Sequence, residues 1–226
     1  MCGICGIVGL GDSAAFGVEQ IDSMRAVLDH RGPDEQGRYV EEFRTGGREG
    51  RIGLGHSRLS IIDLARGHQP ISNEDDSIQL VFNGEIYNFK TLRSELESRG
   101  HRFATDSDTE VIVHAYEEHG VKCLDSLRGM FAFALWDARR NMLFCARDRI
   151  GQKPFCYRAE SGRFLFASEI KALLQLDDVP RSLHLPALHD YLPNQYQLNP
   201  ITMFQRIRKL PPPHFLVCKD DQLPSQ

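Results

Sequence analysis

The sequence has 226 residues, of which 41% are hydrophobic and 26% are charged, and its formal net charge is −4 at pH 7. That length can bury a core, and the acidic balance lacks the basic footprint of proteins that bind nucleic acids or anionic membranes. No run of 18 apolar residues is present, so we expect no membrane-spanning helix. The N-terminus lacks the basic segment and cleavage site of a signal peptide, and we therefore expect a cytoplasmic protein.

Hydrophobic periodicity predicts the elements of the first third of the chain. Ile21, Met24 and Leu28 recur at helical spacing, and the glycine-interspersed apolar run before them is typical of a strand that other backbone approaches closely. In chain order we expect a strand at 4–10, a helix at 17–30, strands within 36–56 on either side of a polar tip at 44–51, and a strand at 78–82.

Capping residues delimit two helices after this last strand. Asn88 is placed to cap the first helix, and Gly100 to end it. Ser107 and Glu110 have the spacing of a capping box at the start of the second helix. Beyond it we expect strands at 130–136, 142–147, 154–158 and 163–167, the last two around the turn Ser161-Gly162, and short helices at 169–176 and 184–192.

The order of these elements predicts the fold class. Strands come in groups of two or more, with helices between the groups, which differs from the strict alternation of doubly wound folds. We therefore expect an α+β fold with largely antiparallel sheets covered by helices. The main domain is placed at 2–192. Residues 193–226 are richer in Pro, Gln and Asn, and their break at Pro211-Pro212-Pro213 predicts a connection followed by a last strand.

The six cysteines do not indicate a metal or redox centre. Four of them lie singly within apolar runs, which is typical of small buried side chains. Cys2 and Cys5 form a C-x-x-C pair, but no second pair or spaced histidine pair completes a zinc site. Phosphate-binding loops of the forms G-x-x-x-x-G-K-S/T and G-x-G-x-x-G are also absent. We therefore expect neither a metal nor a cofactor in this chain.

Cys2 can combine a nucleophile and a base once Met1 is removed. Cysteine is small enough for the initiator methionine to be trimmed, and trimming leaves a thiol and a free α-amine on one residue. A thiol with an ordinary pKa of about 8.5 needs a base at neutral pH, and free α-amines titrate at about 7.7–8.0. N-terminal threonine hydrolases use the same arrangement. Taken alone, a cysteine at position 2 is more often chance than a nucleophile.

Three further positions each carry a functional and a structural interpretation. Arg58, among apolar residues, suits bidentate capture of a carboxylate, or an edge-strand ion pair with Asp63. Asn83-Gly84 could form an oxyanion hole from the Asn83 amide and the Gly84 N–H, although Asn-Gly is also the favoured hairpin turn. Asp108, at a helix start, is stabilised by the helix dipole and could also bind an ammonium group. Arg58 and Asp108 together match the two charged groups of a free amino acid.

Seven ordered motifs resemble the class II glutamine amidotransferases, and most closely the N-terminal domain of glutamine-hydrolysing asparagine synthetases. The motifs are MCGICG, HRGPDEQG (30–37), HSRLSIIDL (56–64), VFNGEIYN (81–88), TDSDTEVI (105–112), LRGMFAFALWD (127–137) and ARDRIGQKPFCY (146–157). They cover residues 1–175 densely. The resemblance implies an N-terminal-nucleophile hydrolase fold, in which two antiparallel sheets stack face to face between helical layers as a four-layer α/β/β/α sandwich.

The resemblance also implies catalytic roles. Cys2 would attack the side-chain amide of glutamine while its own amine moves the proton. Asn83 and Gly84 would stabilise the oxyanion, a contribution of about 3 kcal/mol per donor. Ammonia would then leave, and water would hydrolyse the γ-glutamyl thioester to glutamate. Arg31 in the RGPD turn would order the site, although a plain turn is the simpler interpretation.

The remaining predicted residues would bind the substrate. Arg58 would hold the glutamine α-carboxylate and Asp108 the α-amine, with Glu85 beside Asp108. Backbone near Ile61 and Ile62 would add contacts. Family members continue into a synthetase domain that uses ATP and magnesium and carries an S-G-G-x-D-S loop, which this sequence lacks. A synthetase domain in cis or in trans is therefore the expected partner, and a homodimer is also compatible with the resemblance.

Several alternatives stay open at this stage. Cys5 stands where relatives carry an aromatic residue, so it is either inert or a partner for unwanted oxidation of Cys2. Pro213 replaces an expected glycine in the segment 206–220. The chain is interpreted as a fragment in preference to a free glutaminase. An amidotransferase with another ammonia acceptor and a non-catalytic partner module are the other interpretations.

Overall fold

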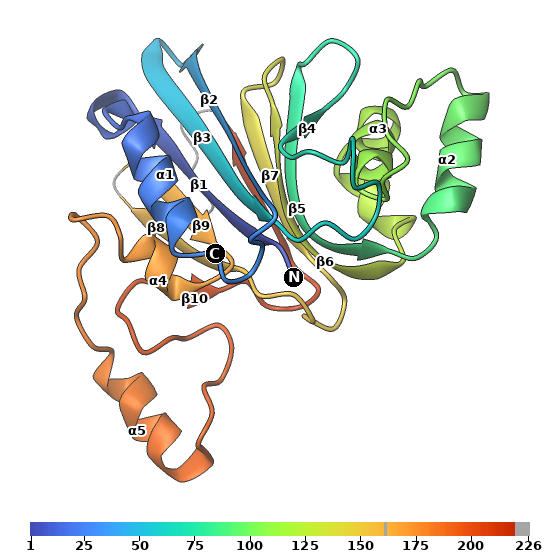
Figure 1. Ribbon diagram of the computed structural model, residues 1–226. Helices are drawn as coiled ribbons and strands as arrows, with labels where there is room; N and C mark the ends of the chain where they lie inside the picture. The colour runs from blue at the N-terminus through green and yellow to red at the C-terminus, as the bar shows by residue number, and fades with distance from the viewer. Residues whose placement is uncertain (161, 220–226) are drawn as a thin grey trace.

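The computed structural model describes residues 1–160 and 162–219, and within them the chain forms two stacked antiparallel sheets with helices on both outer faces (Figure 1). Ser161 of the predicted turn, and residues 220–226 at the end of the predicted connection, lie outside the described residues. The expected α+β, four-layer α/β/β/α arrangement is confirmed.

The first sheet, called sheet A, contains the N-terminal strand at its centre. Its strands in spatial order are β10 (Arg208–Lys209), β8 (Cys156–Glu160), β9 (Arg163–Ala167), β1 (Gly3–Leu10), β3 (Arg48–Arg58) and β2 (Glu35–Thr45). The second sheet, sheet B, has the order β11 (Phe215–Lys219), β7 (Met142–Arg147), β6 (Gly129–Asp137), β5 (Ile78–Ile86) and β4 (Ile71–Ser72).

Helices cover the outer face of each sheet. On sheet A lie α1 (Val18–Ala26) and α4 (Ile170–Leu173), and on sheet B lie α2 (Phe89–Ser98) and α3 (Glu110–His119) (Figure 1). The 3-10 turns η1 (Gly11–Ala14) and η2 (Gly120–Asp125) follow β1 and α3. A further helix, α5 (Leu185–Asn194), projects from the body of the molecule.

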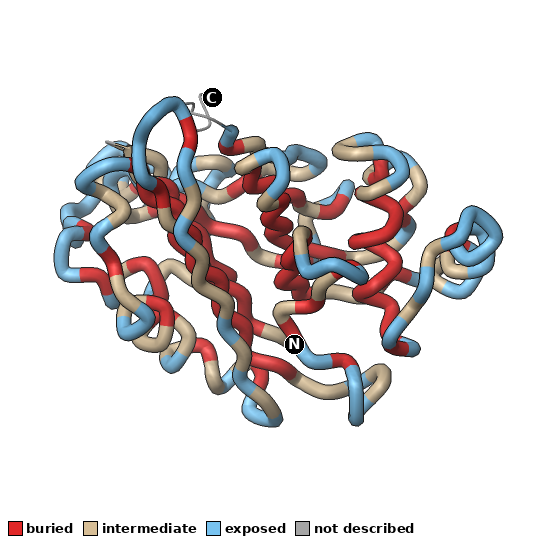
Figure 2. Tube along the Cα trace, turned by 90° about the horizontal axis from the view of Figure 1, so that it is seen from above, coloured by how far each residue is buried: buried red, intermediate tan, exposed pale blue. Residues whose placement is uncertain are grey.

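Side-chain alternation along the strands divides the apolar residues into layers. In β1, Ile4 and Val8 face the space between the sheets, whereas Cys5 and Ile7 pack beneath α1. In β5, Val81 belongs to the inter-sheet layer, and its neighbours face the helices. Because strand side chains alternate with a period of two, each sheet contributes to two cores, and its central strands are buried throughout (Figure 2).

Aromatic rings from sheet A fill part of the inter-sheet core and lie directly over its central strand. Phe155 and Phe166 stack with ring centroids 5.4 Å apart. A Cβ added to Gly6 would lie 2.4 Å from the Phe166 ring and 2.7 Å from the Gly53 carbonyl oxygen. Gly6 therefore lets sheet A accept the large rings that fill the space between the sheets.

The strand predicted at 78–82 is longer than expected. It continues through Asn83 and Gly84 to Ile86, and these two residues pair with Ala132 and Phe131 of β6. The hairpin-turn interpretation of Asn-Gly is therefore wrong. The local turn preference is overridden because β6, distant in sequence, supplies a pairing partner for the backbone.

The predicted capping box is also wrong. Helix α3 begins at Glu110 without a side-chain cap. The Glu110 carboxylate instead accepts hydrogen bonds from the Ala104 and Thr105 N–H groups at 2.7 and 2.8 Å, and the Ser107 hydroxyl contacts the Thr105 hydroxyl at 2.8 Å. These side chains therefore stabilise the loop before the helix.

Other predicted boundaries shift by a few residues. Asn88 occupies the N-cap position of α2, but its amide bonds the Ser126 carbonyl and the Arg128 N–H instead of the helix. The helix expected at 17–30 ends at Ala26 and continues as turns. The strand expected at 154–158 begins at Cys156, and the helices expected at 169–176 and 184–192 span Ile170–Leu173 and Leu185–Asn194.

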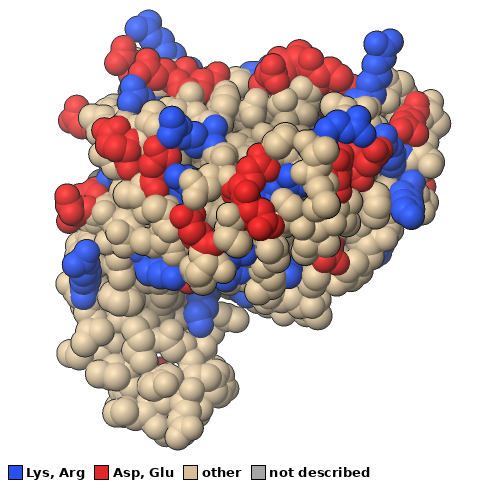
Figure 3. Space-filling model, viewed as in Figure 1, with Lys and Arg blue, Asp and Glu red and all other residues tan. Residues whose placement is uncertain are grey.

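The segment around α5 exposes apolar side chains. Leu185 and Leu192 on this helix are 68% and 69% exposed, and the projecting lobe shows few charged side chains on the face seen in Figure 3. The strands that follow it return to the body, where β10 pairs with β8 and β11 with β7. Among the described residues, no helix combines the length and apolar character required to cross a bilayer.

Substituting Gly6 tests the close inter-sheet packing. We expect Gly6→Ala to lower the free energy of unfolding by about 1–3 kcal/mol. The new methyl group would overlap the Phe166 ring and the Gly53 carbonyl oxygen, and the Gly53 backbone is held within the sheet. Urea denaturation measures this change. Glu95→Ala on the exposed surface of α2 is the control and should change stability by less than about 0.5 kcal/mol. Equal stability of both variants would contradict the packing argument.

Candidate active site

Cys2 precedes β1 and continues its alternation of side chains. Since Ile4 and Val8 face sheet B, the Cys2 thiol also points toward the inter-sheet space, and it lines a cavity there. Cys5, three residues later, faces α1 and is fully buried, and burial raises the pKa of its thiol to about 12. The two sulfurs of the C-x-x-C pair therefore lie on opposite faces of one strand and share no site.

The backbone of Cys2 is held by Arg31. The guanidinium Nε donates to the Cys2 carbonyl oxygen at 3.0 Å, and Nη1 pairs with Glu169 Oε1 at 2.8 Å. Arg31 lies in the turn after α1 and Glu169 just before α4, so elements distant in sequence converge on the first residues of the chain. The expectation that Arg31 orders the site agrees with this contact.

The thiol of Cys2 is partly desolvated. Its sulfur accepts from the Leu59 N–H at 3.4 Å and lies 3.7 Å from the Leu59 carbonyl oxygen. Burial raises the pKa of the thiol, and the Leu59 backbone contact and the nearby positive charge of Arg58 oppose this effect only in part. The thiol is therefore protonated at neutral pH and requires a base to act as a nucleophile.

Asn83 offers an unpaired donor in the same space. As an odd-numbered residue of β5, it shares the inter-sheet face with Val81. Its side chain is 1% exposed, and its amide Nδ2 has no hydrogen-bond partner. An unsatisfied buried amide costs about 1–3 kcal/mol, and this cost would be relieved by an acceptor placed in the cavity.

The Gly84 N–H is a second donor at this position. In β5, the N–H groups of Phe82 and Ile86 point away from β6, since they donate to Gln69 Oε1 and Asp108 Oδ2 at 2.7 and 2.8 Å. Alternation in an antiparallel pair gives the Gly84 N–H the same direction, and β4 pairs only with the other end of β5. The Gly84 N–H therefore points toward the cavity beside the Asn83 amide.

Glycine is required at position 84 by close packing. A Cβ there would lie 2.2 Å from the Met130 carbonyl oxygen. Because glycine has no side chain, the backbone at position 84 can pack closely against β6 while its N–H faces the cavity. Asn83 and Gly84 together present two N–H donors from consecutive residues, which is the arrangement of an oxyanion hole.

Asp108 is a buried carboxyl group that lines the same cavity. Its Oδ2 accepts the Ile86 N–H, and burial raises the pKa of the carboxyl to about 6, with a smaller contribution from the negative charge of Glu85. The hydrogen bond from Ile86 opposes the shift. A cation bound beside Asp108 and Glu85 would restore the charged form, because an opposite charge favours ionisation.

Arg58 ends β3 with its guanidinium buried. Nη1 pairs with Glu35 Oε2 at 2.9 Å, and Nη2 donates to the Ile62 and Asp63 carbonyl oxygens at 3.2 and 2.6 Å. The alternative interpretation as an edge-strand pair with Asp63 is wrong, since β3 lies between β1 and β2 and the Asp63 contact is to its carbonyl. Arg58 fixes the loop that carries Ile61 and Ile62.

All of the predicted site residues line one cavity of about 110 Å³ between the ends of β1, β3 and β5. They are Cys2, Arg58, Ile61, Ile62, Asn83, Gly84, Glu85 and Asp108. The cavity thus brings together a thiol, two N–H donors, the Arg58 guanidinium and the carboxyl groups of Glu85 and Asp108. Its polar lining matches a small ligand with a carboxylate, an ammonium group and a carbonyl.

Sequence reasoning missed other residues of the cavity. Leu59 contacts the sulfur only through its backbone, which no side-chain pattern reveals. Gln69 positions β5 through the Phe82 N–H. Lys153 is buried with its ammonium 3.0 Å from the Met1 sulfur. Leu59 and Lys153 belong to the motifs HSRLSIIDL and ARDRIGQKPFCY, and that membership is the signal that could have pointed to them.

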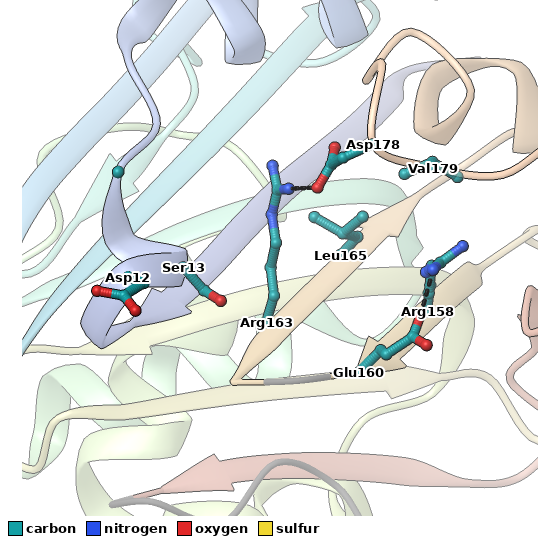
Figure 4. A pocket seen from close by; sticks show the side chains of 9 residues that line it. Asp12, Ser13, Arg158, Glu160, Arg163, Leu165, Asp178 and Val179 are labelled. Carbon is teal, nitrogen blue, oxygen red and sulfur yellow. Dashed lines mark hydrogen bonds and ion pairs between the residues drawn. The ribbon is translucent and has the colours of Figure 1, made fainter.

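A larger cavity of about 410 Å³ lies outside this site, beside β8, β9 and η1 (Figure 4). The two arginines that line it form ion pairs, Arg163 with Asp178 and Arg158 with Glu160. Arg158 Nη1 and Arg163 Nε have no hydrogen-bond partner, but no thiol is among the residues that line this cavity. The smaller inter-sheet cavity is therefore the candidate active site.

Comparisons with known proteins agree with this geometry. A family model described as a glutamine amidotransferase domain matches residues 1–226. Two Bacillus subtilis proteins, asparagine synthetases [glutamine-hydrolyzing] 3 and 1, are each 39% identical to the chain, over 226 and 215 residues. These matches cover 99% and 94% of this chain but 36% and 32% of the relatives. The chain thus spans about a third of the length of these curated relatives.

Two solved structures share the fold at lower identity. An allosteric regulatory enzyme of purine biosynthesis matches with a TM-score of 0.64 and 19% identity, covering 97% of this chain and 47% of that one. Glutamine phosphoribosylpyrophosphate amidotransferase from B. subtilis matches with a TM-score of 0.57 and 23% identity, covering 76% and 43%. The motifs, the cavity and the full-length family match agree, and the chain belongs to the glutamine amidotransferase domain family.

Proposed function

We propose that this chain hydrolyses L-glutamine to glutamate and ammonia through a γ-glutamyl thioester on Cys2. The observation that carries the proposal is the meeting, in one cavity, of the Cys2 thiol with the two N–H donors of Asn83 and Gly84. A nucleophile next to an oxyanion hole is the minimum equipment for acyl transfer. The family match supports glutamine as the acyl donor.

Removal of Met1 supplies the base. In the untrimmed chain the nitrogen of Cys2 is an amide, which cannot accept a proton. Met1 is 54% exposed at the cavity, so its peptide bond is accessible to an aminopeptidase. The freed amine of Cys2 takes the thiol proton as sulfur attacks the glutamine δ-carbon, and then passes it to the departing amide nitrogen.

The oxyanion forms within reach of two donors. As the tetrahedral intermediate develops, its oxygen accepts from the Asn83 Nδ2 and from the Gly84 N–H. Both donors belong to β5, whose backbone is fixed by pairing with β6, so little reorganisation accompanies the reaction. Loss of ammonia leaves the thioester, and the same amine then activates water for its hydrolysis.

The charged groups of glutamine select its orientation. Arg58 attracts the α-carboxylate through its positive charge, and it fixes the loop that places Ile61 and Ile62 beside the ligand. Asp108 and Glu85 bind the α-ammonium group. Binding of these two charged groups directs the side-chain amide of glutamine toward Cys2. Amides that lack an α-carboxylate and an α-ammonium group would bind poorly.

The ammonia acceptor in this proposal is aspartate. The relatives at 39% identity are named glutamine-hydrolysing asparagine synthetases, and this supports asparagine synthesis in a synthetase domain outside this chain, in cis or in trans. ATP and magnesium would act in that domain. A reduced thiol is needed, which the cytosol maintains, and all six cysteines are free thiols.

The first prediction concerns the nucleophile. Met1-trimmed protein should release one ammonia per glutamine consumed, and Cys2→Ala should abolish release because no other thiol is among the residues that line the cavity. Cys5→Ala is the matched control and should stay active, since Cys5 faces α1. Ammonia is followed by an enzyme-coupled assay, and mass spectrometry verifies trimming. Undiminished release from Cys2→Ala would rule out the mechanism.

The second prediction concerns the oxyanion hole. Asn83→Ala should lower kcat by about 10²- to 10³-fold with little change in KM, because the amide binds charge that develops only in the transition state. Steady-state kinetics measures the effect. Asn194→Ala, outside the cavity on α5, is the control. A rise in KM at constant kcat would assign Asn83 to ground-state binding instead.

The third prediction concerns Asp108. Its pKa of about 6 in the ligand-free protein means that the carboxylate is charged above pH 6 and neutral below it. Glutamine keeps its ammonium group throughout this range, so its affinity should fall as pH drops through 6. Calorimetry with the Cys2→Ala variant measures Kd without turnover. Adding Asp108→Asn should weaken binding about tenfold at pH 8 and remove the pH dependence; a Kd constant from pH 5 to 8 without it would contradict the assignment.

A further inference from the structure

A second cluster of polar side chains lies in the helical layer on sheet B, outside the Cys2 cavity. Glu74 comes from the turn between β4 and β5, His101 from the loop after α2, and His114 and Glu117 from α3. One ligand atom from each side chain lies within 4.8 Å of the others. The neighbouring positions of β4, α2 and α3 in Figure 1 explain how these segments meet.

The two carboxylates are each held by one oxygen and present the other. Glu117 Oε1 accepts from the Asn73 amide at 2.8 Å, whereas its Oε2 lies 2.8 Å from His114 Nδ1 and 3.5 Å from His101 Nδ1. Glu74 Oε1 accepts the Arg102 N–H at 3.1 Å, and its Oε2 lies 3.9 Å from His114 Nδ1. Both Oε2 atoms therefore face the imidazole nitrogens, and Glu117 Oε2 is hydrogen-bonded to His114 Nδ1.

The two histidines show the same division of roles. Each directs Nδ1 to the centre of the cluster, while Nε2 meets an outer carboxylate. His101 Nε2 lies 3.1 Å from Glu118 Oε1, and His114 Nε2 lies 3.5 Å from Glu110 Oε1. The hydrogen bond from His101 Nε2 to Glu118 can fix a proton there and leave the His101 Nδ1 lone pair available, as in the carboxylate–histidine–metal arrangement of protein sites. His114 Nδ1 is hydrogen-bonded to Glu117 Oε2, and a metal ion would replace that proton.

The charge around the cluster also favours a cation. Four carboxylates, those of Glu74, Glu110, Glu117 and Glu118, contact the two imidazoles. Among the described residues, Arg99 is the one guanidinium in an ion pair with this group, at 2.9 Å from Glu118. His114 is fully buried, and its Nε2 has no hydrogen-bond partner, so the site is both negative and partly dry.

We propose that Glu74, His101, His114 and Glu117 bind one divalent transition-metal ion, with zinc as the best match. Two imidazoles and two carboxylates suit tetrahedral zinc, whose bonds to nitrogen and oxygen of about 2.0–2.2 Å separate ligand atoms by roughly 3.3–3.5 Å. The ligand atoms lie within 4.8 Å of one another, with three separations of 2.8, 3.5 and 3.9 Å, so binding requires side-chain adjustments of up to about 1 Å around the ion. The ion would join the β4–β5 turn to α3 and the end of α2.

Zinc binding and cobalt spectroscopy test this site directly. After chelator treatment, the wild-type chain should bind one Zn²⁺ in calorimetry and show a higher Tm with the metal. Co²⁺ should give the intense visible absorption bands of tetrahedral coordination. His101→Gln and Glu74→Gln, which change partly exposed side chains, should each weaken Zn²⁺ binding by about tenfold or more. His189→Gln, an exposed histidine on α5, should bind as the wild type does.

Two results would overturn the proposal. One is wild-type protein that binds no stoichiometric Zn²⁺, which would mean that hydrogen bonds alone hold the cluster. The other is equal affinity in His101→Gln, Glu74→Gln and His189→Gln, which would place the metal elsewhere. Ammonia release from glutamine is measured separately on chelator-treated protein, so a failure of the glutaminase mechanism and a failure of the metal site are distinguishable.

Discussion

The face-to-face stacking of the two sheets is the constraint on which the candidate site depends. Aromatic and aliphatic side chains between the sheets hold β1 against β5, and His56 Nε2 of β3 bonds the Phe82 carbonyl of β5 at 3.1 Å. Burial lowers the pKa of His56 to about 4, so a neutral imidazole joins the sheets. Strand alternation then decides which side chains meet, and it directs Cys2 and Asn83 into one space.

The site departs from the rule that buried polar groups are paired within the protein. Asn83 keeps an unpaired amide, and the Asp108 carboxyl is desolvated. Each costs stability, and in the proposed function each would be complemented by a different part of glutamine. A ligand lacking one of these groups would leave the corresponding cost in place, which would make the cavity selective.

Hydrophobic patterns predicted the α+β class and most of the strands because these patterns are long and bounded by turn residues, whereas the four-layer stacking was implied by the family resemblance. It predicted the cavity residues through chemistry-bearing motifs. It failed where a partner distant in sequence decided the outcome, as at Asn83-Gly84, where β6 replaces the expected turn, and at Glu110, which bonds the preceding loop. The His101 and Glu74 cluster was missed because its members come from three segments with no recognisable spacing.

The contact between Arg31 and Cys2 has a consequence for maturation. The Arg31 guanidinium donates a hydrogen bond to the Cys2 carbonyl oxygen, and strand pairing of β1 begins at Gly3. These backbone hydrogen bonds therefore all lie on the C-terminal side of the peptide bond between residues 1 and 2. Proteolysis of that bond would remove the side-chain contact between Met1 and Lys153 but no backbone hydrogen bond of β1. The new chain end would therefore keep its position, and its lone pair would lie beside the sulfur without any refolding of the domain.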